Sequence, residues 1–250
     1  MAAPARSPLA TLLHLVALCS LSWAFHQLAL PGPMSDYMDS VPVGGRWQYL
    51  TILSLAASWL SFAAALVHDL VPLALFSRLK AILAILTVPV EGLVAVLYWS
   101  LTLYDPALLS PAVAPGESPL RIPLALDLAL HALPALFLWT DFLAFSPPLP
   151  TRAHPALIAA AATAAYCAWM EHCAQGNGRY PYPMLDTMPA PARAAFYAAQ
   201  VPVLVALFRV ANAIHRAVRG TGAGSRSEAE RVRRVENKVA KALGVDVRVE

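Results

Sequence analysis

Apolar runs long enough to cross a bilayer follow one another along this chain. A transmembrane helix needs about 20 mostly apolar residues. Short clusters of proline and glycine, which mark loops, lie between the runs. Since backbone in lipid must satisfy its own hydrogen bonds, and since the runs do not alternate as strands would, each is expected to be a helix. The pattern predicts an all-α, polytopic membrane protein with six spans, at about 9–30, 47–71, 79–104, 122–145, 155–173 and 192–218.

The first run has a second interpretation as a cleaved signal peptide. Arg6 precedes it, and Ser22-Trp23-Ala24 is a conceivable cleavage site. The apolar part of a signal peptide is usually about 7–15 residues long, and this run is longer. We therefore favour a retained first span.

Composition indicates a membrane body followed by a charged tail. Hydrophobic residues make up 58% of the chain and charged residues 13%, whereas about 25% of the residues in a soluble domain are charged. The net charge of +3 arises from Arg219 onwards, so it does not indicate nucleic-acid binding. Basic flanks of a membrane domain stay in the cytosol. We predict a membrane domain over residues 1–219, a basic cytosolic tail over 220–250, and both termini in the cytosol.

The tail has two interpretations that the sequence leaves open. Residues 227–230 have the S-x-x-E form of a helix-capping box, and apolar residues from Val232 to Leu243 recur at helical spacing. This pattern favours an amphipathic helix on the anionic cytosolic leaflet. A solvated tail is the equal alternative, because a short charge-rich stretch is marginal as an isolated helix.

Three ionisable residues, His14, Glu91 and His131, lie deep in predicted spans, where such groups are functional candidates by default. Asp127 precedes His131 by four residues, so the two share a helix face, and its carboxylate could fix the tautomer of the imidazole. Pro134 removes a helix amide and predicts a kink beside His131. This arrangement is typical of a polar cavity, although a structural histidine tied to a neighbouring helix would have the same pattern.

Signatures of the common soluble enzymes are missing from the chain. It contains no G-x-S-x-G, H-E-x-x-H, P-loop or G-x-G-x-x-G motif. Its three cysteines, Cys19, Cys167 and Cys173, have neither a disulfide framework nor a zinc spacing. We therefore expect no metal and no cofactor.

Three stretches have a recognisable form. The run from Val43 to Thr51 reads V-G-G-R-W-Q-Y-L-T, the run from Asp127 to Pro134 reads D-L-A-L-H-A-L-P, and Tyr182-Pro183-Met184-Leu185 follows the fifth predicted span. Together they resemble the androgen-induced protein family, whose members are multi-span threonine hydrolases of fatty acid esters of hydroxy fatty acids. The first run is the most specific. The resemblance covers about residues 8–218 and leaves out the tail.

The resemblance implies a membrane-embedded hydrolase of bioactive lipid esters. By matching motifs, its nucleophile falls on Thr51 and its base on His131. A hydroxyl becomes a useful nucleophile only beside such a base, and we assign Asp127 the role of orienting group. Two positions depart from the family pattern, since Gln48 stands where a basic residue is expected and Asp127 where asparagine is usual. A carboxylate near an imidazole favours the imidazolium form.

Three further residues are candidates for supporting the site. The backbone amides of Gly44 and Gly45, near the start of the second span, could stabilise an oxyanion. Glu91 lies just after Pro89, which frees a helix carbonyl, so this part of the third span is expected to face protein or water.

A non-catalytic protein that binds or transports lipids is the competing hypothesis. It would use Glu91, His14 and His131 as a polar pathway, although the chain shows no inverted repeat of the transporter kind. Under either hypothesis the partners are membrane lipids, and under the first the substrate is a lipid ester. We expect the protein in the endoplasmic reticulum or another endomembrane rather than in the plasma membrane.

Overall fold

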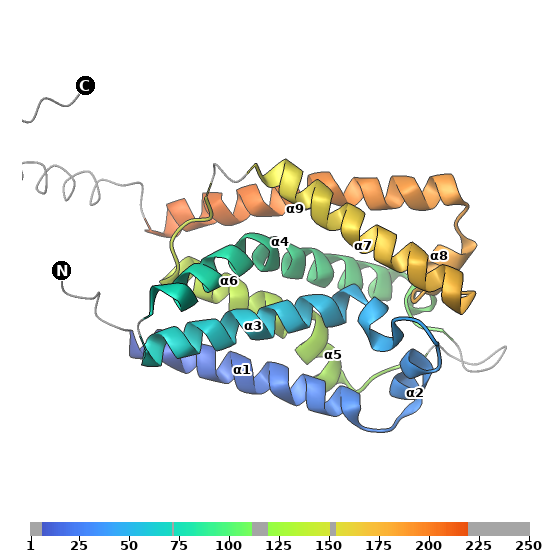
Figure 1. Ribbon diagram of the computed structural model, residues 1–250, viewed down its shortest axis with the longest axis horizontal. Coiled ribbons are helices and arrows are strands. Elements are labelled where there is room, and N and C mark those ends of the chain that lie inside the picture. Colours follow the sequence, from blue (N-terminus) through green and yellow to red (C-terminus); the bar gives the residue numbers. More distant parts are fainter. Residues whose placement is uncertain (1–6, 72, 112–119, 151–153, 220–250) are drawn as a thin grey trace, which may run out of the picture.

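Six long helical segments run up and down in one bundle. The computed structural model describes residues 7–71, 73–111, 120–150 and 154–219. Each predicted span is helical, and no strand occurs among these residues. Successive segments alternate in direction, so α1 begins and α9 ends at the same end of the bundle (Figure 1). The segments are α1 (Pro8–Ala29), α3 (Leu50–Leu70), α4 (Ala74–Tyr104), α5 (Leu124–His131) with α6 (Leu133–Phe145), α7 (Pro155–Asn177) and α9 (Ala190–Arg219).

Short helices that the sequence analysis did not predict occupy loops at the other end of the bundle. They are too brief for a hydrophobic pattern to reveal, and three of them begin at or directly before a proline. Proline is favoured in the first turn of a helix because its fixed φ suits the helix and its missing N–H has no intrahelical partner there. These helices are α2 (Pro33–Asp39), η1 (Gly45–Gln48), η2 (Pro106–Leu108) and α8 (Pro183–Thr187).

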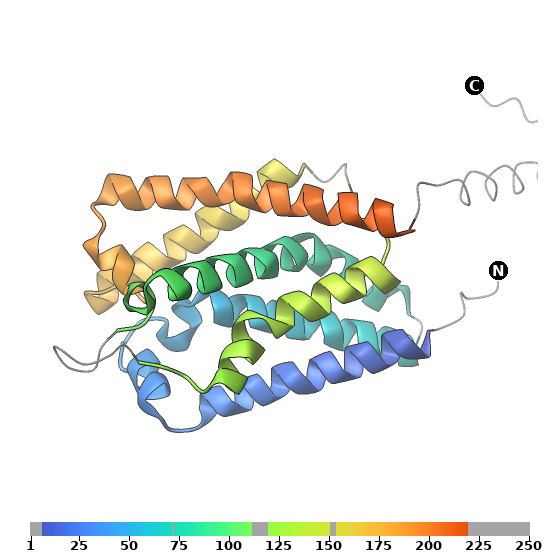
Figure 2. The same cartoon turned by 180° about the vertical axis from the view of Figure 1, so that it is seen from behind.

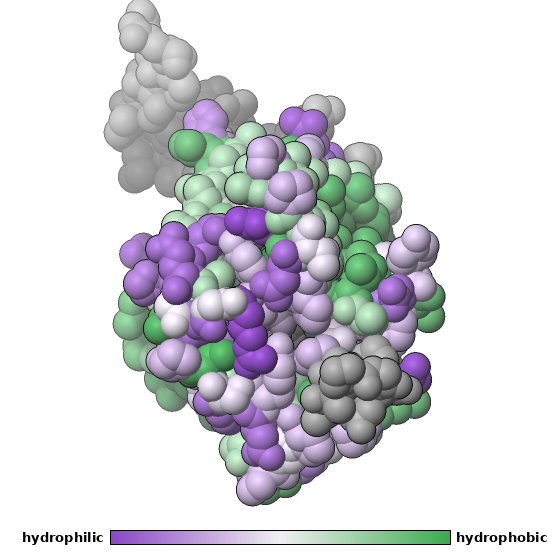
Figure 3. Space-filling view, turned by 90° about the vertical axis from the view of Figure 1, so that its right-hand side faces the viewer, coloured by the Kyte–Doolittle hydropathy of each residue, from purple (hydrophilic) through white to green (hydrophobic). Residues whose placement is uncertain are grey.

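The surface of the bundle suits a bilayer. Large apolar side chains such as Leu12, Ile82 and Leu157 are exposed on its flanks. Seen from the end at which α3 begins, hydrophilic side chains gather on the end face and hydrophobic ones surround it (Figure 3). In the described part of the chain, α1, α3, α4 and α9 are each long and apolar enough to cross a membrane, and α5 with α6 would make a fifth span. The remaining segment, α7, has 23 residues but carries Glu171 and His172 near its C-terminus.

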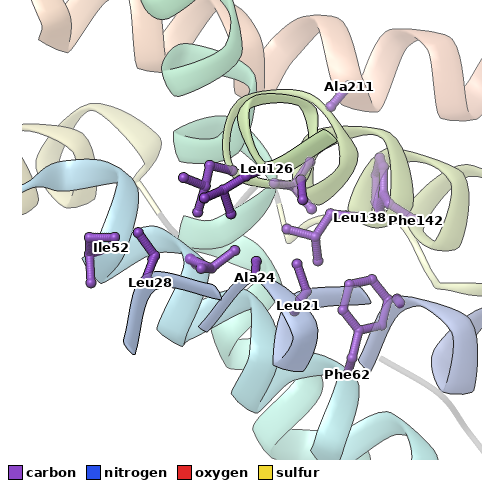
Figure 4. Close-up of a cluster of buried hydrophobic side chains, with 14 of the residues drawn as sticks. Leu21, Ala24, Leu28, Ile52, Phe62, Leu126, Leu138, Phe142 and Ala211 are labelled. Atoms are coloured by element: carbon purple, nitrogen blue, oxygen red, sulfur yellow. The ribbon is translucent and has the colours of Figure 1, made fainter. Parts of the chain in front are cut away.

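The largest cluster of buried side chains joins α1, α3, α5 and α6. Leu21 of α1 and Leu55 of α3 are fully buried, and Phe62 and Phe142 are almost so (Figure 4 shows much of this cluster). The small residue Ala24 lets α1 approach its neighbours closely. Helices α7 and α9 pack on each other, and α9 also packs on α4 and α6. This arrangement leaves space between α4 and α7 for the cavity described below.

The predicted kink beside His131 is confirmed. Helix α5 ends at His131 and α6 begins at Leu133, with a bend of 41° between them (visible in Figure 2). Pro134 lacks the N–H that would continue the ladder, and its ring cannot fit against the preceding turn. The indole of Trp99 donates a hydrogen bond of 3.2 Å to the His131 carbonyl at the break. His131 therefore stands at the break, not within a continuous helix.

The predicted start of the second span at residue 47 is wrong by three residues. Gly44 adopts a positive φ of 77°, and the chain then forms the 3₁₀ turn η1 before Tyr49 becomes extended. Helix α3 begins only at Leu50. A side chain at Gly44 would meet the sulfur of Cys173 at 2.7 Å, so glycine is required by the contact with α7 as well as by its φ. Thr51 consequently lies in the first turn of its helix, not one turn inside it.

Candidate active site

Thr51 and His131 line the same cavity. It has a volume of about 600 Å³ and is lined by residues of α2, α3, α4 and α5 and by loop residues next to η2 and before α5. Thr51 reaches it from the first turn of α3, and His131 from the last turn of α5. Helices α3 and α5 run in the same direction in the bundle (Figure 1). The start of α3 can lie near the end of α5 because α5 is short and stops at the break. We call this space the junction cavity.

The imidazole of His131 is held from two sides. Its Nδ1 lies 2.8 Å from Asp127 Oδ1 and 3.2 Å from the Asp127 carbonyl oxygen. The ring of Tyr98 stacks flat against the imidazole, with ring centroids 3.3 Å apart and planes 3° from parallel. Both acceptors lie at Nδ1, so Nδ1 carries the proton and Nε2 presents its lone pair. Within the described residues Nε2 has no hydrogen-bond partner, which suits a base.

Asp127 serves two neighbours at once. Besides bonding to Nδ1 of His131, its carboxylate lies near the hydroxyl of Tyr98 on α4. Asp127 and Tyr98 both line the junction cavity. The carboxylate therefore sets the tautomer of His131 and lies beside the residue that stacks on the imidazole.

A second cavity of about 550 Å³ meets the first at Thr51. It lies between α3, α4, α7 and α9 and is lined mainly by apolar side chains. We call it the apolar cavity. Four residues line both cavities: Thr51, Tyr98, Leu109 and Tyr182. A molecule with two arms could therefore occupy both cavities with its branch point at the Thr51 hydroxyl.

Four other sequence candidates do not line either cavity. Gly44 and Gly45 shape the loop before α3, and Gln48 is buried with its side-chain oxygen 3.5 Å from Asn177 Nδ2. Gln48 thus faces α7, and its departure from the family pattern does not alter the cavity wall. Glu91 is 1% exposed and accepts a 2.7 Å hydrogen bond from Ser58, so its predicted burial is confirmed. It ties α4 to α3.

His14, the remaining deep histidine, belongs to a separate cluster at the opposite end of the bundle. Its Nδ1 lies 2.7 Å from Asp69 and its Nε2 lies 2.8 Å from Asp141. Lys80 forms a further ion pair of 2.8 Å with Asp141. Because both ring nitrogens of His14 contact carboxylates, neither is free to act as a base. In the part of the chain that the structure describes, no group of His, Cys, Asp or Glu side chains is arranged to hold a metal ion.

Sequence reasoning missed two site residues, Tyr98 and Tyr182. Tyr98 lies in an apolar helix without any local motif, so nothing in the sequence pointed to it. Tyr182 begins the Tyr-Pro-x-Leu stretch noted above, yet that motif suggested no chemistry by itself. Both residues enter the site through packing between distant segments.

Comparison with known proteins decides the family. A family model described as FAR-17a/AIG1-like protein matches residues 9–216. The chain belongs to the FAR-17a/AIG1-like family. A relative in Schizosaccharomyces pombe, described as a UPF0641 membrane protein, is 33% identical over 217 residues, which cover 86% of this chain and 94% of the relative. No solved structure matches the chain.

Membership of the FAR-17a/AIG1-like family confirms the resemblance that the three motifs indicated. The family match runs from the start of α1 into the last turn of α9 and includes all the cavity-lining helices. Residues 220–250, where an amphipathic helix was one interpretation, lie outside both the family match and the described residues. The chain is a membrane protein with several apolar helices.

Proposed function

We propose that this protein is a membrane-embedded hydrolase of bioactive lipid esters, with fatty acid esters of hydroxy fatty acids as the substrate class. One observation carries the proposal: a threonine hydroxyl and a histidine with an unoccupied Nε2 line one cavity. The histidine is oriented by Asp127 in the manner required of a general base.

The proposed reaction has two steps. In the first, Oγ of Thr51 attacks the ester carbonyl carbon while its proton passes to Nε2 of His131. The C–O bond to the alcohol half then breaks, and His131 returns the proton to the leaving alkoxide, which gives a free hydroxy acid and an acyl-Thr51 ester. In the second step water repeats the sequence, with His131 taking its proton, and the fatty acid and Thr51 are released.

The shape of the site supports this substrate class. An ester of a hydroxy fatty acid has two long arms that meet at the ester group. The junction cavity and the apolar cavity likewise meet at Thr51. Their apolar walls are suited to hydrocarbon chains, and chains of this kind can enter from the bilayer.

We further propose six spans with both termini in the cytosol. Each long segment reverses direction, and α1 begins where α9 ends, at one end of the bundle (Figure 1). This arrangement supports an even number of crossings. The basic tail would then lie beside the anionic cytosolic leaflet. The site would lie toward the non-cytosolic end, in the endoplasmic reticulum or another endomembrane.

The competing hypothesis of a lipid transporter has less support. A polar pathway through His14, Glu91 and His131 needs these groups to share a continuous space. His14 is bound at both nitrogens, Glu91 is bound to Ser58, and neither lines a cavity that contains His131.

The test of the proposed function is ester hydrolysis by membranes from cells that express matched amounts of each variant. Thr51→Val keeps the branched shape and removes the nucleophile, so we expect loss of turnover, whereas Thr51→Ser keeps a hydroxyl and retains part of it. Labelling of the wild-type protein by a serine-hydrolase activity probe should depend on Thr51 in the same way. Full activity in Thr51→Val would exclude the hydrolase as described and favour lipid binding or transport.

A further inference from the structure

Tyr182 lies where the two cavities meet. It precedes α8, and its half-buried side chain lines both the junction cavity and the apolar cavity. Its ring packs edge-to-face against Tyr49, with centroids 5.5 Å apart and planes at 85°. Such a pair holds both rings in one orientation. The hydroxyl of Tyr182 is thereby directed toward the start of α3.

A backbone hydrogen bond holds this hydroxyl beside the proposed nucleophile. Its oxygen accepts the backbone N–H of Leu50 at 3.2 Å. The side chains of Tyr166 and Thr51 lie near the same oxygen. Burial raises the pKa of Tyr182 above its usual value near 10, and these neighbours only partly oppose the rise. At neutral pH the group is therefore a neutral phenol with a proton to donate.

The backbone of Thr51 offers a second donor at the same place. Thr51 is the second residue of α3, and the first N–H groups of a helix have no partner within it. The next two amides, of Ile52 and Leu53, bond to the Tyr49 carbonyl. The Thr51 N–H has no acceptor within the described residues, and the helix N-terminus favours negative charge nearby.

We propose that the Tyr182 hydroxyl and the Thr51 backbone N–H form the oxyanion hole of this hydrolase. The inference rests on the proposed function and extends it. When Thr51 Oγ bonds to the ester carbon, the carbonyl oxygen gains a negative charge one bond away from that carbon. A donor that contacts Oγ in the resting site is then within reach of the oxyanion. This assignment replaces the amides of Gly44 and Gly45, which do not line the cavities.

The role of Tyr182 is transition-state stabilisation, so its loss should affect turnover rather than substrate binding. Tyr182→Phe keeps the ring and its contact with Tyr49 and removes only the hydroxyl. We expect kcat to fall about 10²–10³-fold with KM changed less than about threefold. The matched control is Tyr37→Phe, which removes a tyrosine hydroxyl in α2 at the same end of the bundle but outside both cavities. It should leave kcat unchanged.

A second measurement separates the oxyanion hole from general packing. An alkyl boronic acid forms a tetrahedral adduct with the nucleophile, so its affinity should fall in Tyr182→Phe by a factor similar to that in kcat. A non-hydrolysable ether analogue of the substrate resembles the ground state and should bind wild type and variant alike. Thermal unfolding in detergent should show the same Tm for both proteins.

Two outcomes would overturn the inference. The first is unchanged kcat in folded Tyr182→Phe, and the second is a loss of affinity for the ether analogue equal to that for the boronic acid. If Tyr182→Phe does not accumulate, 3-fluorotyrosine at position 182 keeps the hydroxyl and makes it a stronger acid. An altered kcat then supports the role, and an unaltered kcat refutes it. Failure of the proposed function looks different, because wild type and Thr51→Val would then hydrolyse esters equally.

Discussion

The side chain of Asp127 is the residue-scale feature on which the state of His131 depends. Its carboxylate bonds to Nδ1 of His131 and so sets the tautomer of the imidazole, on which the ring of Tyr98 stacks. An asparagine at this position could offer its amide oxygen to the same Nδ1–H. We therefore propose that the site requires the hydrogen bond rather than the negative charge.

This reasoning predicts a graded series of activities. His131→Ala should lower turnover about 10²–10⁴-fold, the range for loss of a general base. Asp127→Leu, which accepts no hydrogen bond, should lie between His131→Ala and wild type, and Asp127→Asn should remain within about tenfold of wild type because its amide oxygen can still accept the Nδ1–H. Combining Thr51→Ala with His131→Ala should add little to either change, because the two residues act as a unit.

The measurement is the initial rate of ester hydrolysis at matched expression of each variant. Asp127→Asn as inactive as His131→Ala would show that the charge itself is essential. Full additivity in the double variant would mean that Thr51 and His131 act independently, contrary to the dyad.

At the scale of the helices, a charged cluster far from the site holds four segments together. His14 of α1, Asp69 of α3, Lys80 of α4 and Asp141 of α6 are joined by ion pairs of 2.7–2.8 Å. Asp69 and Asp141 lie near the ends of α3 and α6, where water could be expected to reach them. Asp141 is instead only 3% exposed, because the ends of four helices converge around it.

Removing the centre of this cluster should destabilise the bundle without touching the site. His14→Ala leaves two carboxylates without their shared partner, and loss of one member of a buried ion pair costs about 3–5 kcal/mol. We expect a clear fall in the Tm of the purified protein in detergent. His26→Ala, on the exposed face of the same helix, is the matched control and should unfold like wild type. An unchanged Tm for His14→Ala would mean that the cluster contributes nothing to stability.

At the scale of the whole molecule, the alternating direction of the long segments makes topology testable. If all six cross the membrane, the end of α9 and the start of α1 share one side, and the basic residues after Arg219 assign that side to the cytosol. A glycosylation acceptor fused to the tail should therefore stay unmodified in cells. The same acceptor inserted between α4 and α5 should be glycosylated, which serves as the positive control.

Glycosylation of the tail would contradict the six-span arrangement. With a cytosolic N-terminus it would mean an odd number of crossings, as when α7 does not cross. Removal of the first segment as a signal peptide would leave the tail on the cytosolic side, so mass determination of the mature N-terminus tests that alternative separately.

Local features of the sequence were sufficient for much of this protein. The positions of the six helical segments follow from apolar runs and proline clusters, since burial in lipid leaves helix as the available backbone structure. The bend beside His131 follows from Pro134, and the pairing of Asp127 with His131 follows from their spacing on one helix. All of these depend on neighbours in the sequence and not on contacts between distant segments.

The sequence alone did not determine which segments meet. The meeting of Thr51 with Tyr182 across more than 130 residues depends on how α3, α7 and α8 rotate and tilt, and each rotation depends on every other contact in the bundle. The start of α3 was likewise decided by tertiary contact, because Gly44 must lie against Cys173 and the chain forms η1 before the helix can begin. The hydrophobic pattern predicts neither feature, because apolar residues that face lipid and apolar residues that line a cavity cannot be told apart in the sequence. The sequence therefore determined the helices and the chemistry of the Asp127–His131 pair, and only the packing of the helices decided that this pair, Thr51 and Tyr182 share one site.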